Sequence, residues 1–374
     1  MYFKSKHMIP ADQKKLSIAF MNSIKADEWR GGEKWMVNAA AGLAARGHAV
    51  VCIGRKSALW LEKAGARGVE TLGLPIHADF DPFIISRCAK LFTKRQTDIL
   101  CCNFEKDVRL GGIAGKFARV NKIFVRKGLC LMHDKLRYRL AYKYIVDDII
   151  TPAAFIKKQF SAFPWLSQDR IHVVPNGVEV PDTSAWDRGK LRKAAGISQA
   201  EPVVLGAGSI FSQKGFDYFV EALSLLHRQG IRVHGAIAGD GETENLAALA
   251  GRLGIASFIH LLGRRSDVLE LMYGADVFAL SSIDEGLPNV VLEAMSVGTP
   301  VAAADAGGTS EIITDGKDGF VVPVRNAAAL AERIARLIND TIVRARMGSA
   351  GNKTVLERFS IRRMIDNIEK LFLQ

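Results

Sequence analysis

The sequence predicts an α/β protein made of two Rossmann-like, doubly wound domains in tandem, and three observations lead to this prediction. The chain has 374 residues, which at roughly 100–200 residues per domain is enough for two or three domains with buried cores. Short apolar runs alternate with helical patterns from Leu16 onward. The alternation is interrupted once, after Asn176-Gly177, by the polar, turn-rich stretch VEVPDTSAWDRGK. We therefore expect one domain at 1–176 and a second at 177–356.

The first domain has seven strand-like segments. Helical patterns such as GGEKWMVNAAAGLAARG and KLRYRLAYKYIV separate them, as expected for β-α-β units of a parallel sheet. The strand-like segments, in order, are LSIAFMNSI, HAVVCIG, VETLGL, DILCCNF, KIFVRKG, DDIITP and IHVVPNG.

The second domain repeats the pattern, starting at VVLGAG and continuing through RVHGAIAG, FIHLLG, DVFALSS, TPVAAAD and FVVP. In the helix FDYFVEALSLLHRQG, apolar residues recur at helical spacing and Gly230 stands where a left-handed C-cap belongs. Residues 357–374 predict a last helix with Met364, Ile368 and Phe372 on one stripe. We expect this helix to cross back and pack on the N-terminal domain. Ligands of such sheets bind at the carboxyl ends of the strands, so we expect the two domains to face a cleft.

Composition and charge exclude several classes of protein. Hydrophobic residues make up 48% and charged residues 24%, which is typical of a folded globular chain. The net charge is +12, and residues 1–180 carry 30 Lys and Arg against 16 Asp and Glu, so the excess lies in the first half. The five cysteines form no CxxC motif and lie in apolar runs, which predicts reduced, buried thiols. With no apolar run of about 18 residues and no signal-peptide pattern at the N-terminus, we expect a cytoplasmic protein.

The stretch DEGLPNVVLEAMSVGTPVAAADAGGTSEII is the most informative for chemistry. A loop carrying Glu285 and Gly286 follows a strand, Pro288 suits the first turn of a helix, and Glu293 lies on that helix. A helix N-terminus favours phosphate or sugar oxygens, and carboxylates beside it accept hydrogen bonds from hydroxyls. The pattern fits a nucleotide sugar. The alternative is that Glu285 is solvated and Glu293 only balances the helix dipole.

These residues resemble a known family. Seven residues separate Glu285 from Glu293. This spacing resembles the E-x7-E signature of family 4, the retaining group 1 glycosyltransferases of GT-B fold. Ordered similarities to the same family cover nearly the whole chain; they are Gly31-Gly32, VVPNGV, GSIFSQKGFDYFVEAL, IAGDGE, HLLGRRSDV and DGKDGFVVP. The resemblance implies a hexosyl-transferring enzyme with a nucleotide-sugar donor and a saccharide or lipid-linked acceptor, in lipopolysaccharide or other cell-surface polysaccharide synthesis. It implies no metal and no other cofactor.

The resemblance also implies roles for single residues. Lys214 would neutralise the diphosphate, Glu293 would hold the ribose, and Glu285 would hold the donor sugar near its reacting carbon. Arg264 lies where members of the family place backbone groups against the nucleotide base. The alternative is that Arg264 is an ordinary exposed arginine. Ser209 stands where family members usually have an Arg. The expected donor-binding set is Gly208, Ser209, Gln213, Lys214, Arg264, Glu285, Gly286, Leu287, Pro288, Asn289 and Glu293.

On the acceptor side, the resemblance points to Gly31 and Gly32 and to a polar residue after the fourth strand. The candidates are Asp107 and, in reserve, His133, each of which could instead be a helix cap or surface residue. Retention by front-face attack would leave the acceptor proton to the departing phosphate, so no protein nucleophile is expected. The formal metal motif Asp79-Phe80-Asp81 precedes a helical pattern and is expected to cap that helix.

The sequence is also compatible with two other classes of protein. A nucleotide-sugar epimerase or a phosphorylase would share the fold. A nucleic-acid-binding protein would explain the basic charge, but no such module is visible and we expect no nucleic acid partner. Instead we expect the basic first half to meet the anionic lipid headgroups at the inner face of the cytoplasmic membrane. The segments expected there are Lys94-Arg95, Arg126-Lys127, Lys135, Arg137, Arg139, Lys143 and Lys157-Lys158. A phosphorylated oligosaccharide, or an ordinary solvated basic face, is the alternative.

Overall fold

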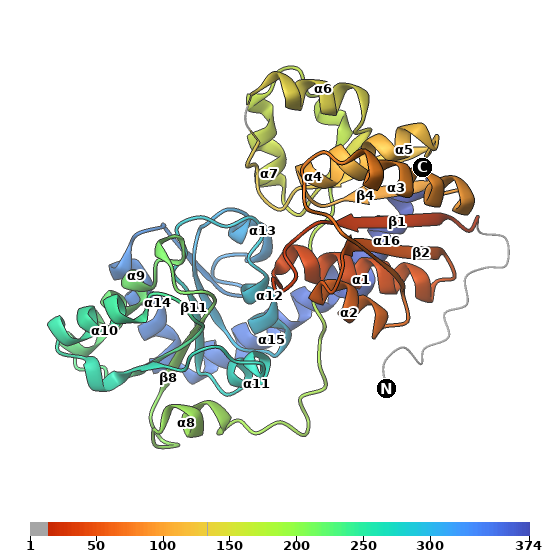
Figure 1. Ribbon diagram of the computed structural model, residues 1–374. Coiled ribbons are helices and arrows are strands. Elements are labelled where there is room, and N and C mark those ends of the chain that lie inside the picture. The colour runs from red at the N-terminus through yellow and green to blue at the C-terminus, as the bar shows by residue number, and fades with distance from the viewer. Residues whose placement is uncertain (1–13, 133) are drawn as a thin grey trace. The chain divides into compact units, whose positions relative to one another are not determined.

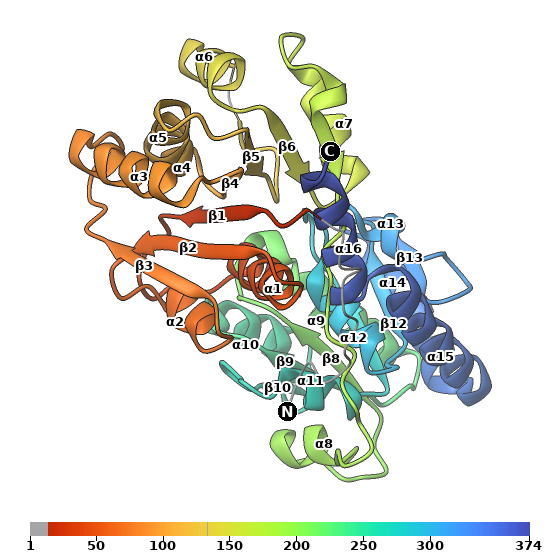
Figure 2. The same ribbon diagram turned by 90° about the vertical axis from the view of Figure 1, so that its right-hand side faces the viewer.

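The computed structural model describes residues 14–132 and 134–374. Contacts divide the chain into two compact units, one formed by 1–177 with 361–374 and the other by 178–360. Each unit contains one fully parallel sheet covered by helices (Figures 1 and 2). The predicted pair of doubly wound α/β folds is confirmed.

The first unit has a seven-stranded sheet in the order β3-β2-β1-β4-β5-β6-β7. Its strands are β1 (Ser17–Asn22), β2 (Ala49–Arg55), β3 (Glu70–Leu74), β4 (Ile99–Cys102), β5 (Lys122–Arg126), β6 (Asp148–Thr151) and β7 (Ile171–Val173). Its helices are α1 (Gly31–Ala45), α2 (Leu59–Gly65), α3 (Pro82–Arg95), α4 (Glu105–Asp107), α5 (Ile113–Phe117), α6 (Leu136–Tyr144), α7 (Ala154–Gln159) and α16 (Ile361–Phe372). One π-helical turn, Val108–Gly112, joins α4 to α5.

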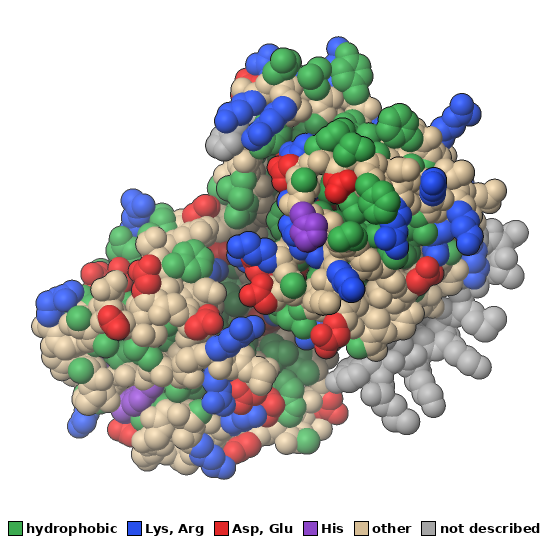
Figure 3. All heavy atoms as spheres, viewed as in Figure 1, with side chains coloured by type: hydrophobic (Ala, Val, Ile, Leu, Met, Phe, Trp, Pro, Cys, Tyr) green, Lys and Arg blue, Asp and Glu red, His purple; other side chains and the backbone are tan. Residues whose placement is uncertain are grey.

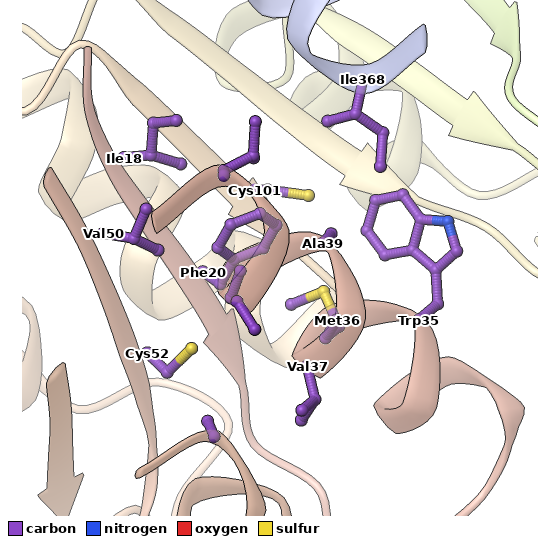
Figure 4. Packing of buried hydrophobic residues seen from close by; sticks show 14 of the residues in the cluster. Ile18, Phe20, Trp35, Met36, Val37, Ala39, Val50, Cys52, Cys101 and Ile368 are labelled. Atoms are coloured by element: carbon purple, nitrogen blue, oxygen red, sulfur yellow. The ribbon is translucent and has the colours of Figure 1, made fainter. Parts of the chain in front are cut away.

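The core on one face of this sheet lies beneath α1, α2 and α16. Phe20 of β1 packs edge-on against Trp35 of α1, and Ile368 of α16 points toward the same cluster (Figure 4). The predicted stripe of Met364, Ile368 and Phe372 is buried here. Gly42 lets the two helices approach, since a Cβ there would lie 2.0 Å from Cδ1 of Ile365. The predicted return of the last helix to the N-terminal unit is confirmed.

The opposite face is covered by α3 and by the helix formed from α4, the π turn and α5. Gly111 of the π turn lies against Met21 of β1, and Gly115 lies against Ile123 of β5. Ile145, which follows α6, contacts Gly112, and Tyr142 of α6 donates a hydrogen bond to Glu105 of α4. The helices α3, α4–α5 and α6 therefore lie in a row, as both ribbon views show (Figures 1 and 2).

The second unit has a six-stranded sheet in the order β10-β9-β8-β11-β12-β13. Its strands are β8 (Val203–Ala207), β9 (His234–Ala238), β10 (Ile259–Leu261), β11 (Val277–Leu280), β12 (Val301–Ala304) and β13 (Phe320–Val322). Its helices are α8 (Lys190–Ala195), α9 (Phe216–Arg228), α10 (Thr243–Arg252), α11 (Val268–Tyr273), α12 (Asn289–Ser296), α13 (Thr309–Ile312), α14 (Ala327–Asn339) and α15 (Thr341–Arg358). The apolar positions of α9 are buried and Gly230 has φ 80°, as predicted.

Candidate active site

The second unit has a topological switch point between β8 and β11. From β8 the sheet continues through β9 and β10 in one direction, and from β11 through β12 and β13 in the other. In open parallel sheets the crevice at such a point, at the carboxyl ends of the strands, is where ligands bind. Residues 208–215 follow β8 and residues 281–288 follow β11, so these two loops frame the candidate site.

The two loops are joined through their backbones. The amide of Ile283 donates to the carbonyl of Gln213 at 2.8 Å, and Gln213 Nε2 donates to the carbonyl of Asp284 at 3.0 Å. Gly215, the N-cap of α9, has φ 58°, and a Cβ on it would lie only 2.3 Å from the carbonyl oxygen of Ser281. A larger residue at 215 would therefore be strained in its backbone and would push the loops apart.

An ion pair lies across this junction. Lys214 Nζ is 2.6 Å from Glu285 Oε1, and Ser282 Oγ donates to the same carboxylate oxygen at 2.8 Å. The two side chains are 20% and 13% exposed, so both are mostly buried but still in contact with solvent. The structure thus brings together Lys214 and Glu285, two of the four residues predicted as catalytic; the other two are Asp107 and His133. An ammonium and a carboxylate next to each other can bind a phosphate oxygen and a hydroxyl of one ligand.

The loop after β12 fixes the backbone at Glu285. Gly307 has φ 62°, and a Cβ there would lie 1.8 Å from the carbonyl oxygen of Glu285. The amide of Gly308 donates to the carbonyl of Gly286 at 2.8 Å. Ser282, Gly307 and Gly308 were not predicted as site residues, although the glycine pair after the strand VAAA was a usable signal.

Five more donor-side candidates lie in the loop after Glu285 and on helix α12. Gly286, Leu287 and Pro288 are buried, and Pro288 caps α12 as the residue before its first turn. Asn289 begins α12 and Glu293 lies in its second turn, partly buried. The helix start therefore leads directly out of the Glu285 loop.

The last three donor-side candidates are Gly208, Ser209 and Arg264, and they lie in two different loops of the second unit. Gly208 has φ 139°, and a Cβ on it would lie 3.6 Å from Cε of Lys214. Ser209, which is exposed, follows it in the same loop. Arg264 is exposed in the turn between the edge strand β10 and α11, and β9 separates β10 from β8. Gly208 and Ser209 thus belong to the switch-point loop, whereas Arg264 follows the edge of the sheet.

The first unit has its own switch point, between β1 and β4, and a buried polar cluster lies there. Gly31 and Gly32 begin α1, followed by Glu33, which is 1% exposed. Glu33 Oε1 accepts hydrogen bonds from Asn22 Nδ2 at 3.0 Å and from Asn103 Nδ2 at 3.3 Å. The predicted glycine turn is therefore held in place by the carboxylate of Glu33, which was not among the predicted site residues.

Arg126 belongs to the same cluster, and its assignment to a membrane-facing surface was wrong. Its side chain is 6% exposed, lies over the ring of Trp35 and donates to Asn176 Oδ1 at 3.4 Å. Burial lowers the pKa of Arg126 to about 10, while the negative charge of Glu33 opposes this shift. The guanidinium fits beside Gly32, where a Cβ would lie 3.4 Å from its Nη1. Sequence alone gave no sign that this cation is buried.

Asp107 is fully buried behind the fourth strand. Its carboxylate accepts the amides of Ser23 at 2.8 Å, Asn103 at 3.2 Å and Phe104 at 2.7 Å. Burial raises the pKa of Asp107 to about 6 against the opposing effect of these hydrogen bonds. The carboxylate thus ties the ends of β1 and β4 together. His133, the reserve candidate, lies outside the described residues.

Several other expectations can be compared with the structure. Asp81 accepts the amides of Phe83 and Ile84, so the formal metal motif caps α3 as predicted. All five cysteines are free of disulfides and four are buried, while Cys130 is half-buried. Across 14–132 and 134–374, no cluster of three or more His, Cys, Asp or Glu is placed to hold a metal ion. Within the same ranges, no helix combines the length and apolar character needed to cross a membrane.

Comparisons with known proteins identify the family of the chain. Residues 187–354 match the model of the group 1 glycosyl transferases, and residues 29–181 match that of glycosyltransferase family 4. The chain is 32% identical over 322 residues to the putative glycosyltransferase EpsD of Bacillus subtilis, covering 81% of this chain and 84% of that protein. It is 31% identical over 223 residues to the lipopolysaccharide core biosynthesis glycosyltransferase LpsE of Rhizobium meliloti, covering 59% of this chain and 63% of that protein.

Solved structures share the fold. A glycosyltransferase from Rickettsia africae superposes with a TM-score of 0.85 at 22% identity, covering 96% of this chain and 98% of that one. HepE of Anabaena, solved in complex with UDP, superposes with a TM-score of 0.82 at 21% identity, covering 95% and 99%. Fold and switch-point site together define a GT-B protein of the nucleotide-sugar-using class. The chain belongs to glycosyltransferase family 4, the retaining group 1 transferases.

Proposed function

We propose that this protein transfers a sugar, with retention of configuration, from a nucleotide-sugar donor to a saccharide or lipid-linked acceptor. The observation that carries the proposal is the Lys214–Glu285 pair at the switch point of the second unit. It offers a cation for a diphosphate and a carboxylate for sugar hydroxyls within 2.6 Å of each other. The second unit is thus the donor domain and the first unit the acceptor domain of the proposed enzyme, with the last helix completing the first.

The proposed mechanism assigns the departing charge to Lys214. Negative charge grows on the diphosphate as the glycosidic bond breaks, so a fixed ammonium stabilises the transition state more than the bound donor. The backbone amides of Gly286, Leu287 and Asn289, in the loop before α12 and at its first residue, are proposed to bind donor oxygens; Pro288 has no N–H to donate. Glu293 is proposed to bind the ribose. Ser209 and Gln213 supply neutral groups in the same loop, although the Gln213 amide already bonds the Asp284 carbonyl.

The acceptor hydroxyl is proposed to give its proton to the departing phosphate, without a protein nucleophile and without a metal. Asp107 and His133 remain the acceptor-side candidates. The three amide hydrogen bonds of Asp107 favour a positioning role, in which it sets the loops after β1 and β4. In that role it would act through Gly31-Gly32 and the neighbouring Glu33 cluster.

Relatives supply a proposal for the pathway. One, 27% identical over 299 residues, is an Escherichia coli galactosyltransferase that uses UDP-galactose and a diphosphoundecaprenol-linked acceptor. Another is named for capsular polysaccharide biosynthesis in Staphylococcus aureus. We therefore propose a place in the synthesis of lipopolysaccharide or another cell-surface polysaccharide, in the cytoplasm and at the inner face of the membrane, with a uridine diphosphate sugar as donor.

A thermal-shift panel of nucleoside diphosphates tests this proposal. A ligand at 100 times its Kd stabilises the folded state by about 2.7 kcal/mol, which raises Tm by roughly 5 °C or more for a unit of this size. We expect one base to give this shift, with uridine diphosphate the first candidate, and the corresponding nucleoside to give much less. If no nucleoside diphosphate shifts Tm, the proposed donor site is wrong.

A further inference from the structure

The helical row α3, α4–α5 and α6 in the first unit has an unusual charge. The helices α3, α5, α6 and α7 contain ten Lys and Arg residues and no Asp or Glu. The short helix α4 of the row carries Glu105 and Asp107, of which Asp107 is buried. An excess of cations on one set of helices favours an anionic partner. This concentrates the basic excess of the first half of the chain on particular elements.

Helix α6 adds an apolar stripe that faces away from the protein. Leu136 is 70% exposed, Leu140 is 47% exposed and Tyr144 is 61% exposed. These positions follow one another at four-residue spacing and so share one face of the helix. The opposite face carries the buried Tyr138 and Tyr142, which hold α6 to the domain.

Cations border this stripe on both sides. At 100° per residue, Arg137 lies beside it in one direction and Arg139 with Lys143 in the other, and all three are exposed. Arg139 pairs with Asp134, at 2.8 Å between Nε and Oδ1. An apolar stripe edged by Lys and Arg on an amphipathic helix is the pattern that lies in the interface of an anionic bilayer.

The neighbouring helices continue the apolar surface. An open groove between α3 and α5 is lined by Phe80, Ile85, Ala89, Ile113 and Phe117, together with Lys90 and Lys94. Phe83 and Phe117 are 66% and 75% exposed. In the space-filling view, hydrophobic side chains gather with Lys and Arg over this part of the first unit (Figure 3). Exposed apolar area of this kind marks an interaction site.

We propose that the stripe Leu136, Leu140 and Tyr144, with its bordering cations, inserts into the headgroup region of an anionic lipid bilayer, and that the α3–α5 groove lies on the same lipid surface. Charge complementarity favours this partner, because the helices α3, α5, α6 and α7 carry ten cations and no carboxylate of their own. Three of the ten, Arg95, Lys116 and Arg139, pair with carboxylates of neighbouring segments, so positive charge stays in excess. The inference extends the proposed function, in which the acceptor is lipid-linked. It concerns a different unit from the donor site, so each can fail without the other.

The test is co-sedimentation of the full chain with vesicles, without donor or acceptor. Vesicles of phosphatidylcholine alone are compared with vesicles containing phosphatidylglycerol, at low and high salt. We expect binding to the phosphatidylglycerol vesicles, weakened by salt, and little binding to neutral vesicles. Equal partition into both vesicle types, or into neither, overturns the proposal.

Two variants separate the apolar and charged contributions. Leu136→Asn/Leu140→Asn/Tyr144→Asn is expected to lower the partition coefficient at least about tenfold by removing apolar area from the lipid contact. Arg137→Gln/Lys143→Gln is expected to lower it about fivefold for each cation removed, at low salt only. Matched controls on the other unit are Ile342→Asn/Leu356→Asn, at exposed apolar positions, and Arg252→Gln/Arg346→Gln, at exposed arginines.

The control variants should bind vesicles like the wild type, and every variant should keep the nucleoside diphosphate shift in Tm, which reports folding of the donor domain. Circular dichroism melts check the first unit. Wild-type partition by the triple variant overturns the assignment of the stripe. A dimer that is seen by analytical ultracentrifugation and abolished in the triple variant would show that a second copy covers the stripe, which also overturns the proposal.

Discussion

Glu285→Gln is expected to lower kcat/KM for sugar transfer at least about a hundredfold while the protein stays folded. Glutamine keeps the size of the side chain and can still accept from Ser282 and Lys214, so the loop geometry survives. It removes the negative charge that balances the ammonium and that orients the sugar hydroxyls. The loss should appear mainly in kcat, because the interaction is strongest when the sugar carries positive charge in the transition state.

The chain offers a matched control for this substitution. Glu357 on α15 belongs to an exposed pair with Lys353 in the same unit, at 3.9 Å, and its side chain is 62% exposed. Glu357→Gln makes the same chemical change far from the two switch-point loops in the sequence and should leave kcat/KM unchanged. Wild-type turnover by Glu285→Gln would remove Glu285 from the chemistry.

Lys214→Ala is expected to reduce transfer by about two to three orders of magnitude, the usual effect of removing one fixed group that stabilises a developing negative charge. It should also weaken binding of the nucleoside diphosphate, because the ammonium contributes to the ground state as well. Titration calorimetry with the nucleoside diphosphate and steady-state kinetics measure the two effects separately. Lys353→Ala, at an exposed position of α15, is the matched control.

The two substitutions should not be additive. Lys214 and Glu285 share an ion pair at 2.6 Å, so removing either one changes the environment of the other. In Lys214→Ala the partly buried carboxylate keeps Ser282 as a hydrogen-bond partner but loses its counter-charge. The double variant should therefore be little worse than the more impaired single variant. Fully additive losses would mean that the two residues act independently.

Much of the fold could be predicted because the alternation of strands and helices is a local pattern. The stripe of Met364, Ile368 and Phe372 even predicted the return of the last helix, since an amphipathic helix must bury its apolar face. The π turn in Val108–Gly112 could not be predicted, because it depends on how Gly111 and Gly112 meet Met21 and Ile145. Contacts between residues far apart in the sequence leave no periodic signal.

For the site, too, single residues could be predicted but the contacts between them could not. Glu285 and Lys214 could be named from motifs, but the ion pair between them could not, because 71 residues separate them. For Arg126 the sequence was misleading about burial. This residue resembles any surface arginine in the sequence, yet Trp35, Asn176 and Glu33 give it buried partners. The role of Ser282 is equally invisible in sequence, since it depends on the loop folding back on Glu285.

Release of nucleoside diphosphate from nucleotide sugars, measured with and without lipid-linked saccharide acceptors, is the decisive test of sugar transfer by this protein. We expect the wild type to release nucleoside diphosphate from donors of one base only when the acceptor is present, and a metal chelator to leave the rate unchanged. We expect almost no release by the variants Lys214→Ala and Glu285→Gln. Acceptor-dependent release at the wild-type rate by those two variants, or no release by the wild type from any nucleotide sugar, would contradict the proposed function.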